Sequence, residues 1–130
     1  MQAEFLAWLR GRRVAGVPDS ALVSRHVEAE FPLTRRGEIV GWVDAVEVLD
    51  VALTCIVSLF EIKPVVDSPF GIIRQAKSYL NLARATFARA DHIDLHIVVP
   101  ASDPLLSQLR AEWPRTWGWG TTFNGDESHG

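Results

Sequence analysis

The sequence of 130 residues contains one cysteine, Cys55, and no Cys-x-x-Cys pair. A disulfide within the chain is therefore impossible, and a structural zinc site is not expected. Cys55 lies in an apolar run, which is typical of a small core residue. Long apolar segments are also lacking, since the run from Phe5 to Leu9 is flanked by Glu4 and Arg10 and is too short for a signal peptide or a membrane span. We therefore expect a cytoplasmic protein without membrane contact.

An excess of positive charge is lacking as well. The net charge is −3, so the global charge does not indicate a nucleic-acid-binding protein. Local groups of arginines form either a basic rim or ordinary solvated surface; they are Arg10, Arg12 and Arg13, then Arg35 and Arg36, then Arg74, Arg84 and Arg89. The hydrophobic content of 48% is that of a folded protein, and no repeat or linker divides the chain. The sequence predicts one domain over residues 1–120 and a polar, flexible tail over residues 121–130.

Residue spacing predicts the order helix, helix, strand, strand, helix, strand, helix, which is typical of one α/β domain. Helices are expected over residues 3–12, 20–31, 71–90 and 104–113, with Pro32 ending the second one. Strands are expected over residues 39–48, 54–63 and 94–99, with a short one near Trp117. Turns are expected at Arg35-Arg36-Gly37 and near Leu49-Asp50. The remaining histidines and tryptophans are interpreted as core, contact or solvated residues; they are His26, His92, His96, Trp113, Trp117 and Trp119.

Two carboxylates stand on neighbouring predicted strands. Asp44 interrupts an otherwise apolar strand face, and Glu61 lies two residues before Lys63, on the same face of the next strand. Converging carboxylates repel each other unless a cation joins them, and oxygen ligands in small number suit Mg²⁺ or Mn²⁺. Lys63 could then orient or deprotonate a water, or stabilise developing negative charge. The alternative is an ion pair between Glu61 and Lys63 at a strand end.

The predicted helix that follows adds polar side chains. Gln75 and Tyr79 are four residues apart and therefore share one helix face. Gln75 could bond a nucleophile or a phosphate. Arg74, Lys77 and Tyr79 are predicted to bind substrate, with Arg74 and Lys77 at flanking positions that could meet phosphates. Glu30, on the predicted helix before the Asp44 strand, could reach the same site.

These residues carry a resemblance. Asp44 followed by Glu61-Ile62-Lys63 resembles the D…(D/E)XK signature of the PD-(D/E)XK nuclease superfamily, which has the restriction-endonuclease-like fold. The run from Gln75 to Tyr79 resembles the QxxxY motif of the RecB-like exonuclease branch, which follows ExK on the next helix. A helical glutamate before the Asp strand is also a family feature; Glu30 matches it best, with Glu28 as the second choice. The resemblance covers residues 30–79.

The resemblance implies an αβββαβ core in which a central mixed sheet is flanked by helices. It also implies divalent-metal-dependent phosphodiester cleavage, with Asp44, Glu61 and the main-chain carbonyl of Ile62 at Mg²⁺ or Mn²⁺ and Lys63 beside them. DNA is favoured over RNA as the substrate, and a homodimer would enlarge the small surface of one copy. Val43 stands where the family name has proline. The alternative function is a catalytically inactive nuclease-fold module for nucleic-acid binding or protein assembly.

Overall fold

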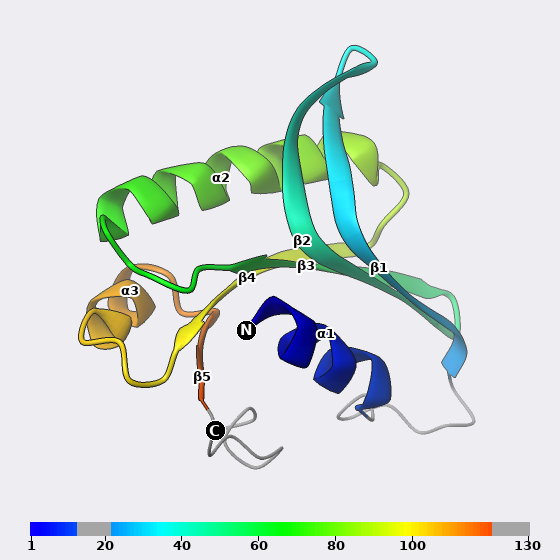
Figure 1. The fold of residues 1–130 in the computed structure, drawn as a ribbon. Helices are drawn as coiled ribbons and strands as arrows, with labels where there is room; N and C mark the ends of the chain where they lie inside the picture. Colours follow the sequence, from blue (N-terminus) through cyan, green and yellow to red (C-terminus); the bar gives the residue numbers. More distant parts are fainter. Residues whose placement is uncertain (13–21, 121–130) are drawn as a thin grey trace.

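The computed structural model describes residues 1–12 and 22–120 (Figure 1). Its elements, in chain order, are α1 (Gln2–Gly11), β1 (Leu22–Arg35), β2 (Glu38–Val51), β3 (Thr54–Ile62), α2 (Pro69–Thr86), β4 (His92–Pro100), α3 (Leu106–Glu112) and β5 (Thr116–Trp119). All five strands form one sheet in the order β1-β2-β3-β4-β5. The first three strands are antiparallel neighbours, and β4 and β5 add in parallel. The predicted α/β class, with a mixed sheet flanked by helices, is confirmed; the predicted tail over residues 121–130 lies outside the described residues.

Each face of the sheet carries its own apolar core. On one face, α2 and α3 pack against buried side chains of β2, β3 and β4; the strand residues include Val46, Val57, Leu59, Leu95 and Ile97. On the other face, α1 places Phe5 and Leu9 against Phe60, Ile62 and Val98. Figure 1 shows α2 and α1 on opposite sides of the strands. Because strand side chains alternate between faces, β3 supplies both cores from adjacent residues.

Helix α2 begins where the sequence supplies a start signal. The hydroxyl of Ser68 accepts a hydrogen bond from the backbone N–H of Gly71 at 3.1 Å, and Pro69 follows at the first helical position. Its buried residues recur at helical spacing and face the sheet; they are Ile73, Ala76, Leu82 and Ala83. The opposite side of α2 carries polar residues. Gln75 and Tyr79 lie at the boundary between the buried and the polar side and are half-buried. The helix therefore lies across the sheet with one polar edge beside the end of β3.

The β1–β2 hairpin bends where Glu30 lies opposite Asp44. Ala29 pairs with Ala45 and Phe31 with Val43, so Glu30 and Asp44 occupy the intervening position. Glu30 has a φ of 52°, the left-handed region that a glutamate seldom adopts. Ala45 belongs to the core on the α1 face, whereas Val43 belongs to the core under α2. The outer half of the hairpin therefore turns out of the sheet and stands over α2 (Figure 1).

The predicted helix over residues 20–31 is wrong, because the described part of that stretch belongs to strand β1. Exposure alternates from Ser24 to Glu30, with Arg25, Val27 and Ala29 half-buried and the residues between them exposed. This period of two was present in the sequence, but the apolar residues also fitted a helical stripe. Pro32 does not end the element. It lies in an edge strand, where a missing N–H can face solvent without breaking a ladder hydrogen bond.

Smaller differences concern element ends. The turn at Arg36-Gly37 is confirmed, with φ values of 53° and 82° that match a tight hairpin turn. The next turn falls at Ala52-Leu53 rather than near Leu49-Asp50, because β2 continues to Val51. Helix α3 begins at Leu106, two residues later than predicted. Within the described ranges, none of the helices has the length and apolar character that a membrane crossing requires.

Candidate active site

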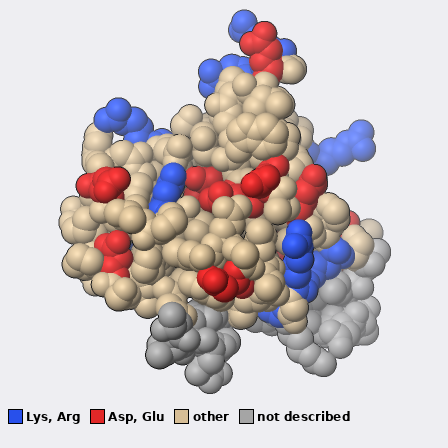
Figure 2. Space-filling model, in the orientation of Figure 1, with Lys and Arg blue, Asp and Glu red and all other residues tan. Residues whose placement is uncertain are grey.

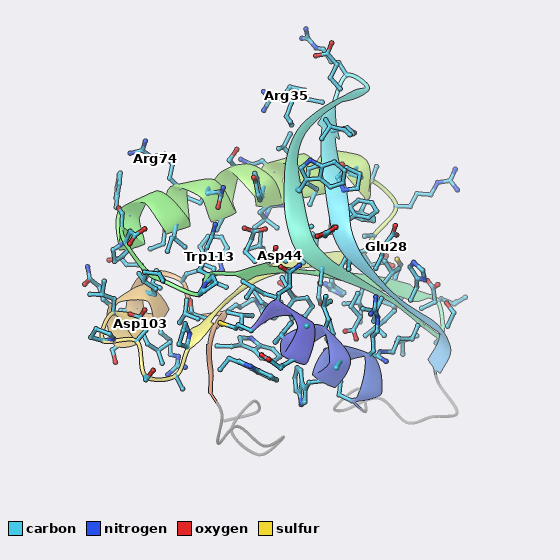
Figure 3. All side chains as sticks on the ribbon, viewed as in Figure 1. Glu28, Arg35, Asp44, Arg74, Asp103 and Trp113 are labelled. Carbon is cyan, nitrogen blue, oxygen red and sulfur yellow. The ribbon has the colours of Figure 1, made fainter. Side chains whose placement is uncertain are left out.

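Asp44 lies at the bend of β2 and points toward the end of β3. Its Oδ2 atom accepts a hydrogen bond from the backbone N–H of Ile62 at 2.6 Å. Figure 3 labels Asp44 at the base of the hairpin, below α2. Burial raises the pKa of Asp44; the hydrogen bond from Ile62 and the charge of Lys63 oppose this shift, and the charge of Glu30 adds to it. The carboxylate is thus anchored to β3 through one oxygen.

Glu61, on β3, is 5% exposed and incompletely paired. Its Oε2 atom lies 3.4 Å from the ammonium of Lys63, while its Oε1 atom is buried with no hydrogen-bond partner in the described structure. Burial raises the pKa of Glu61 to about 7, and the charge of Asp44 adds to the shift, whereas Lys63 and the backbone N–H of Asp44 oppose it. A buried carboxylate oxygen without a partner is costly, so this position calls for a proton or a cation.

A chain of polar contacts joins Lys63 to helix α2. The Lys63 ammonium donates to Gln75 Oε1 at 2.7 Å, and Gln75 Nε2 donates to the Tyr79 hydroxyl at 3.3 Å. The Tyr79 ring lies under Gly41 of the hairpin, where a Cβ atom would stand 2.7 Å from Tyr79 Cε1. Gln75 therefore contacts Lys63, and Tyr79 lies between Gln75 and the hairpin. Tyr79, predicted as a substrate-binding residue, holds Gln75 and supports the hairpin.

Glu30 lies on a strand and not on a helix, which corrects the predicted location of this carboxylate. It lies opposite Asp44 on the edge strand β1, and its charge contributes to the raised pKa of Asp44. The preceding helix α1 packs on the other face of the sheet and offers no carboxylate to the site, since its acidic residue Glu4 pairs with the N-terminus at 3.0 Å. The left-handed φ of Glu30 is backbone strain of a kind that clusters at functional sites.

The other predicted residues lie further out. Glu28 is exposed on β1, where it lies opposite Val46 and has His26 Nε2 at 3.4 Å. Arg74 and Lys77 are exposed on α2; the Arg74 guanidinium lies 4.8 Å from the centre of the Phe70 ring. Figure 3 shows Arg74 on the N-terminal half of α2, pointing away from the sheet. Neither Arg74 nor Lys77 contacts Asp44 or Glu61, so both stay predictions for phosphate binding outside the centre of the site.

The face that carries the site is acidic at its centre. Figure 2 shows acidic side chains close together across the middle of this face, below the hairpin, in the region where Figure 3 labels Asp44. Within residues 1–12 and 22–120, no group of three or more His, Cys, Asp and Glu side chains could hold a metal. Two carboxylates, one with an orphaned buried oxygen, nevertheless fit Mg²⁺ or Mn²⁺, because these ions bind one or two carboxylates and keep several waters. The donor set is therefore compatible with the expected ion.

Two residues that matter for this region were missed in the sequence. Gly41 allows the hairpin to approach Tyr79, and an isolated glycine inside a strand is a recognised signal of close backbone approach.

Glu47 is 1% exposed on the α1 face, where Arg12 contacts its Oε1 at 2.9 Å and Arg25 its Oε2 at 2.8 Å. Arg25 also donates to the carbonyls of Leu9 and Arg10 and so ties α1 to the sheet. In the sequence, a glutamate between two valines indicated a buried charge. No residue near it in the sequence indicated that Arg12 and Arg25 would be its partners.

The remaining singled-out residues have structural surroundings. His96 stacks on Phe60 at 4.9 Å between ring centres, and its Nδ1 accepts from the Trp117 indole; burial lowers the pKa of His96 to about 3. Trp113 donates to the carbonyl of Leu95 at 2.8 Å. In comparisons with protein-family models, curated proteins and solved structures, nothing matches this chain.

Proposed function

We propose that this protein is a nuclease that uses a divalent cation to hydrolyse phosphodiester bonds, with DNA as the favoured substrate. The observation that carries the proposal is the meeting of Asp44 and the incompletely paired Glu61 beside Lys63, which Gln75 holds from α2. An ordinary ion pair at a strand end accounts for Lys63 and one oxygen of Glu61, but not for the second carboxylate, Asp44, beside them. Acidic groups whose pKa values are raised by burial and by each other are typical of functional sites.

The fold supports the same proposal. From α1 to β4 the elements follow the order αβββαβ, with the antiparallel strands β1, β2 and β3 preceding α2 and the parallel strand β4. That order is the one implied by the resemblance to the restriction-endonuclease-like fold. Asp44 and Glu61 come from the second and third strands, and Gln75 from the helix that follows. The glutamate before Asp44 departs from the pattern, because Glu30 lies on β1.

The chain itself supplies three elements of the chemistry. Asp44 and Glu61, with the main-chain carbonyl of Ile62, would hold Mg²⁺ or Mn²⁺. The ion would polarise a phosphoryl oxygen and promote deprotonation of water. Lys63 places a positive charge beside the carboxylates, where it can stabilise negative charge that develops on the phosphate. Gln75 fixes the ammonium of Lys63, so that little reorganisation is needed during the reaction.

Cleavage assays on DNA and RNA with Mg²⁺ or Mn²⁺ test the proposal. We expect cleavage that EDTA abolishes and that Asp44→Asn and Glu61→Gln lack. A chain that binds nucleic acid equally well with and without metal and cleaves none of these substrates would instead be an inactive module.

Lys63→Ala separates catalysis from binding. We expect this variant to lower the cleavage rate by about 100- to 1,000-fold, the usual effect of losing one electrostatic donor in such a site, while metal and substrate affinity change much less. Single-turnover rates with saturating protein isolate the chemical step. Arg89→Ala, which removes an exposed cation outside the site, is the control and should retain the wild-type rate. Wild-type cleavage by Lys63→Ala would exclude this site as the source of the activity.

A further inference from the structure

A series of contacts connects the β1–β2 hairpin to the ammonium of Lys63. The backbone of Gly41 lies against the Tyr79 ring, so that a Cβ atom at Gly41 would stand 2.7 Å from Cε1 and 2.9 Å from the hydroxyl oxygen. That hydroxyl accepts a hydrogen bond from Gln75 Nε2 at 3.3 Å, and Gln75 Oε1 accepts one from Lys63 Nζ at 2.7 Å. The ammonium in turn lies 3.4 Å from Glu61. The position of the hairpin therefore bears on the position of the lysine.

The hairpin is fixed where it meets α2 (Figure 1). Leu33, which pairs with Gly41 across the hairpin, is fully buried. Phe31 stacks on Phe87 at the end of α2, with 5.3 Å between ring centres. The hairpin cannot retreat from α2 without opening these apolar contacts. Tyr79 meets Gly41 with the far end of its side chain and is the partner that can move.

The glycine at position 41 has a steric reason. A glycine inside a strand weakens it, because it packs no side chain, and it is typical of positions where another group approaches the backbone closely. The φ of Gly41 lies outside the left-handed region, so its backbone conformation also suits alanine. The space that the Tyr79 ring occupies is therefore what excludes a side chain here.

We infer that Gly41 is a positioning residue for Lys63: its bare backbone holds the Tyr79 hydroxyl where it orients Gln75, and Gln75 fixes the ammonium. The inference rests on the proposed function for the catalytic role of Lys63. A methyl group at Gly41 displaces the ring and takes the hydroxyl away from Gln75 Nε2. Because a misplacement of about 1 Å in an active site can cost about a hundredfold in rate, this small change should reach the chemistry.

The ammonium signals of the lysines test this role without cleavage. The chain has two lysines, Lys63 and Lys77, so heteronuclear NMR of the metal-free protein follows both side chains, and Lys63→Ala assigns them. We expect Gly41→Ala to shift or broaden the signal of Lys63 and to leave that of the exposed Lys77 unchanged. Tyr79→Phe removes the hydroxyl without adding bulk and should move the same signal. Gly11→Ala is the control, since it adds a methyl group at an exposed position of α1 where the described residues leave open space.

Cleavage rates provide a second readout. In single turnovers with saturating protein, Gly41→Ala should lower the rate by about ten- to a hundredfold while substrate affinity changes little. The double variant Gly41→Ala/Tyr79→Phe should cleave no more slowly than the slower single variant, because both changes remove the same hydrogen bond. Effects that multiply in the double variant would show two independent defects and would overturn the connection through Tyr79.

The outcomes separate this inference from the proposed function. A Lys63 signal that is the same in wild type, Gly41→Ala and Tyr79→Phe overturns the positioning role, even where wild type cleaves. A signal that moves in Gly41→Ala but not in Tyr79→Phe also overturns it, because the hydroxyl is then not the connection. If the signal moves in both variants and wild type cleaves no substrate with metal, the positioning of Lys63 stands and the proposed nuclease activity fails.

Discussion

Glu47 and Glu61 are both buried glutamates of one sheet, and they differ in their partners. Glu47 faces α1, where Arg12 and Arg25 bind one oxygen each. Glu61 faces α2, where Lys63 lies 3.4 Å from one oxygen, the other oxygen has no partner in the described structure, and Asp44 is close enough to raise its pKa. The first carboxylate is compensated by the folded chain alone, whereas the second is not.

This contrast distinguishes a buried charge that the folded chain compensates from one that it leaves incompletely compensated. A buried carboxylate that is bonded at both oxygens can tie elements together, as Glu47 does for α1 and the sheet through Arg12 and Arg25. An incompletely paired carboxylate destabilises the fold, and such destabilisation is typical of sites that bind something else.

The largest expected effect on stability is at Glu47. Glu47→Ala leaves Arg12 and Arg25 without their buried partner, which typically costs about 3–5 kcal/mol. We expect a correspondingly lower free energy of unfolding in urea at neutral pH. Glu4→Ala, which removes an exposed carboxylate of α1, is the control and should change little. A Glu47→Ala protein as stable as wild type would show that its ion pairs do not hold α1.

Glu61→Gln should behave oppositely in metal-free protein. The pKa of Glu61 rises from 4.5 to about 7 on folding, so the folded state retains a proton that the unfolded state releases. The contribution of Glu61 to the free energy of unfolding of wild type is complete below pH 4.5. It decreases as the pH rises toward 7, and above pH 7 it stays lost. The loss is on the order of 3 kcal/mol. Urea titrations in EDTA should show this fall in wild type but not in Glu61→Gln, which is expected to be as stable as wild type or more stable above pH 7. A clear loss of stability in Glu61→Gln would favour a structural ion pair with Lys63.

Metal affinity should depend on pH through the same group. Because a metal ligand must be deprotonated, each binding event below pH 7 displaces the proton of Glu61. We expect the affinity for Mn²⁺ to rise by up to about tenfold per pH unit below 7 and to level off above it. Calorimetry in buffers with different ionisation enthalpies measures the released proton directly. Asp44→Asn should lose the binding, and unchanged affinity in that variant would remove Asp44 from the ligand set.

The smallest expected effect is at Arg74. An exposed cation that meets one phosphate contributes mainly through counterion release, so Arg74→Ala should weaken nucleic-acid binding at low salt more than at high salt. The slope of log affinity against log salt should fall by roughly one in magnitude. Arg110→Ala, on α3, is the matched control and should leave the slope unchanged. An identical slope for Arg74→Ala and wild type would place Arg74 outside the binding surface.

The sequence predicted the centre of the site better than its surroundings. Asp44, Glu61, Lys63 and Gln75 could be brought together because strand alternation and helical spacing specify faces locally. The strand at Glu30 was mistaken for a helix, since its apolar residues fitted both periods and its pairing with β2 is a tertiary contact. Glu47 was missed for a related reason: Arg12 and Arg25 are distant in sequence, and only the packing of α1 brings them together.

The change in melting temperature on adding Mn²⁺ tests the central claim most directly, namely that Glu61 is left incompletely paired because it binds a cation. A ligand that binds only the folded state at about 100 times its Kd raises stability by about 2.7 kcal/mol. We predict that saturating Mn²⁺ at pH 7.5 raises the melting temperature of wild type and of the destabilised Glu47→Ala, but not of Glu61→Gln. An equal response in wild type and Glu61→Gln, or no response in wild type, would contradict the account.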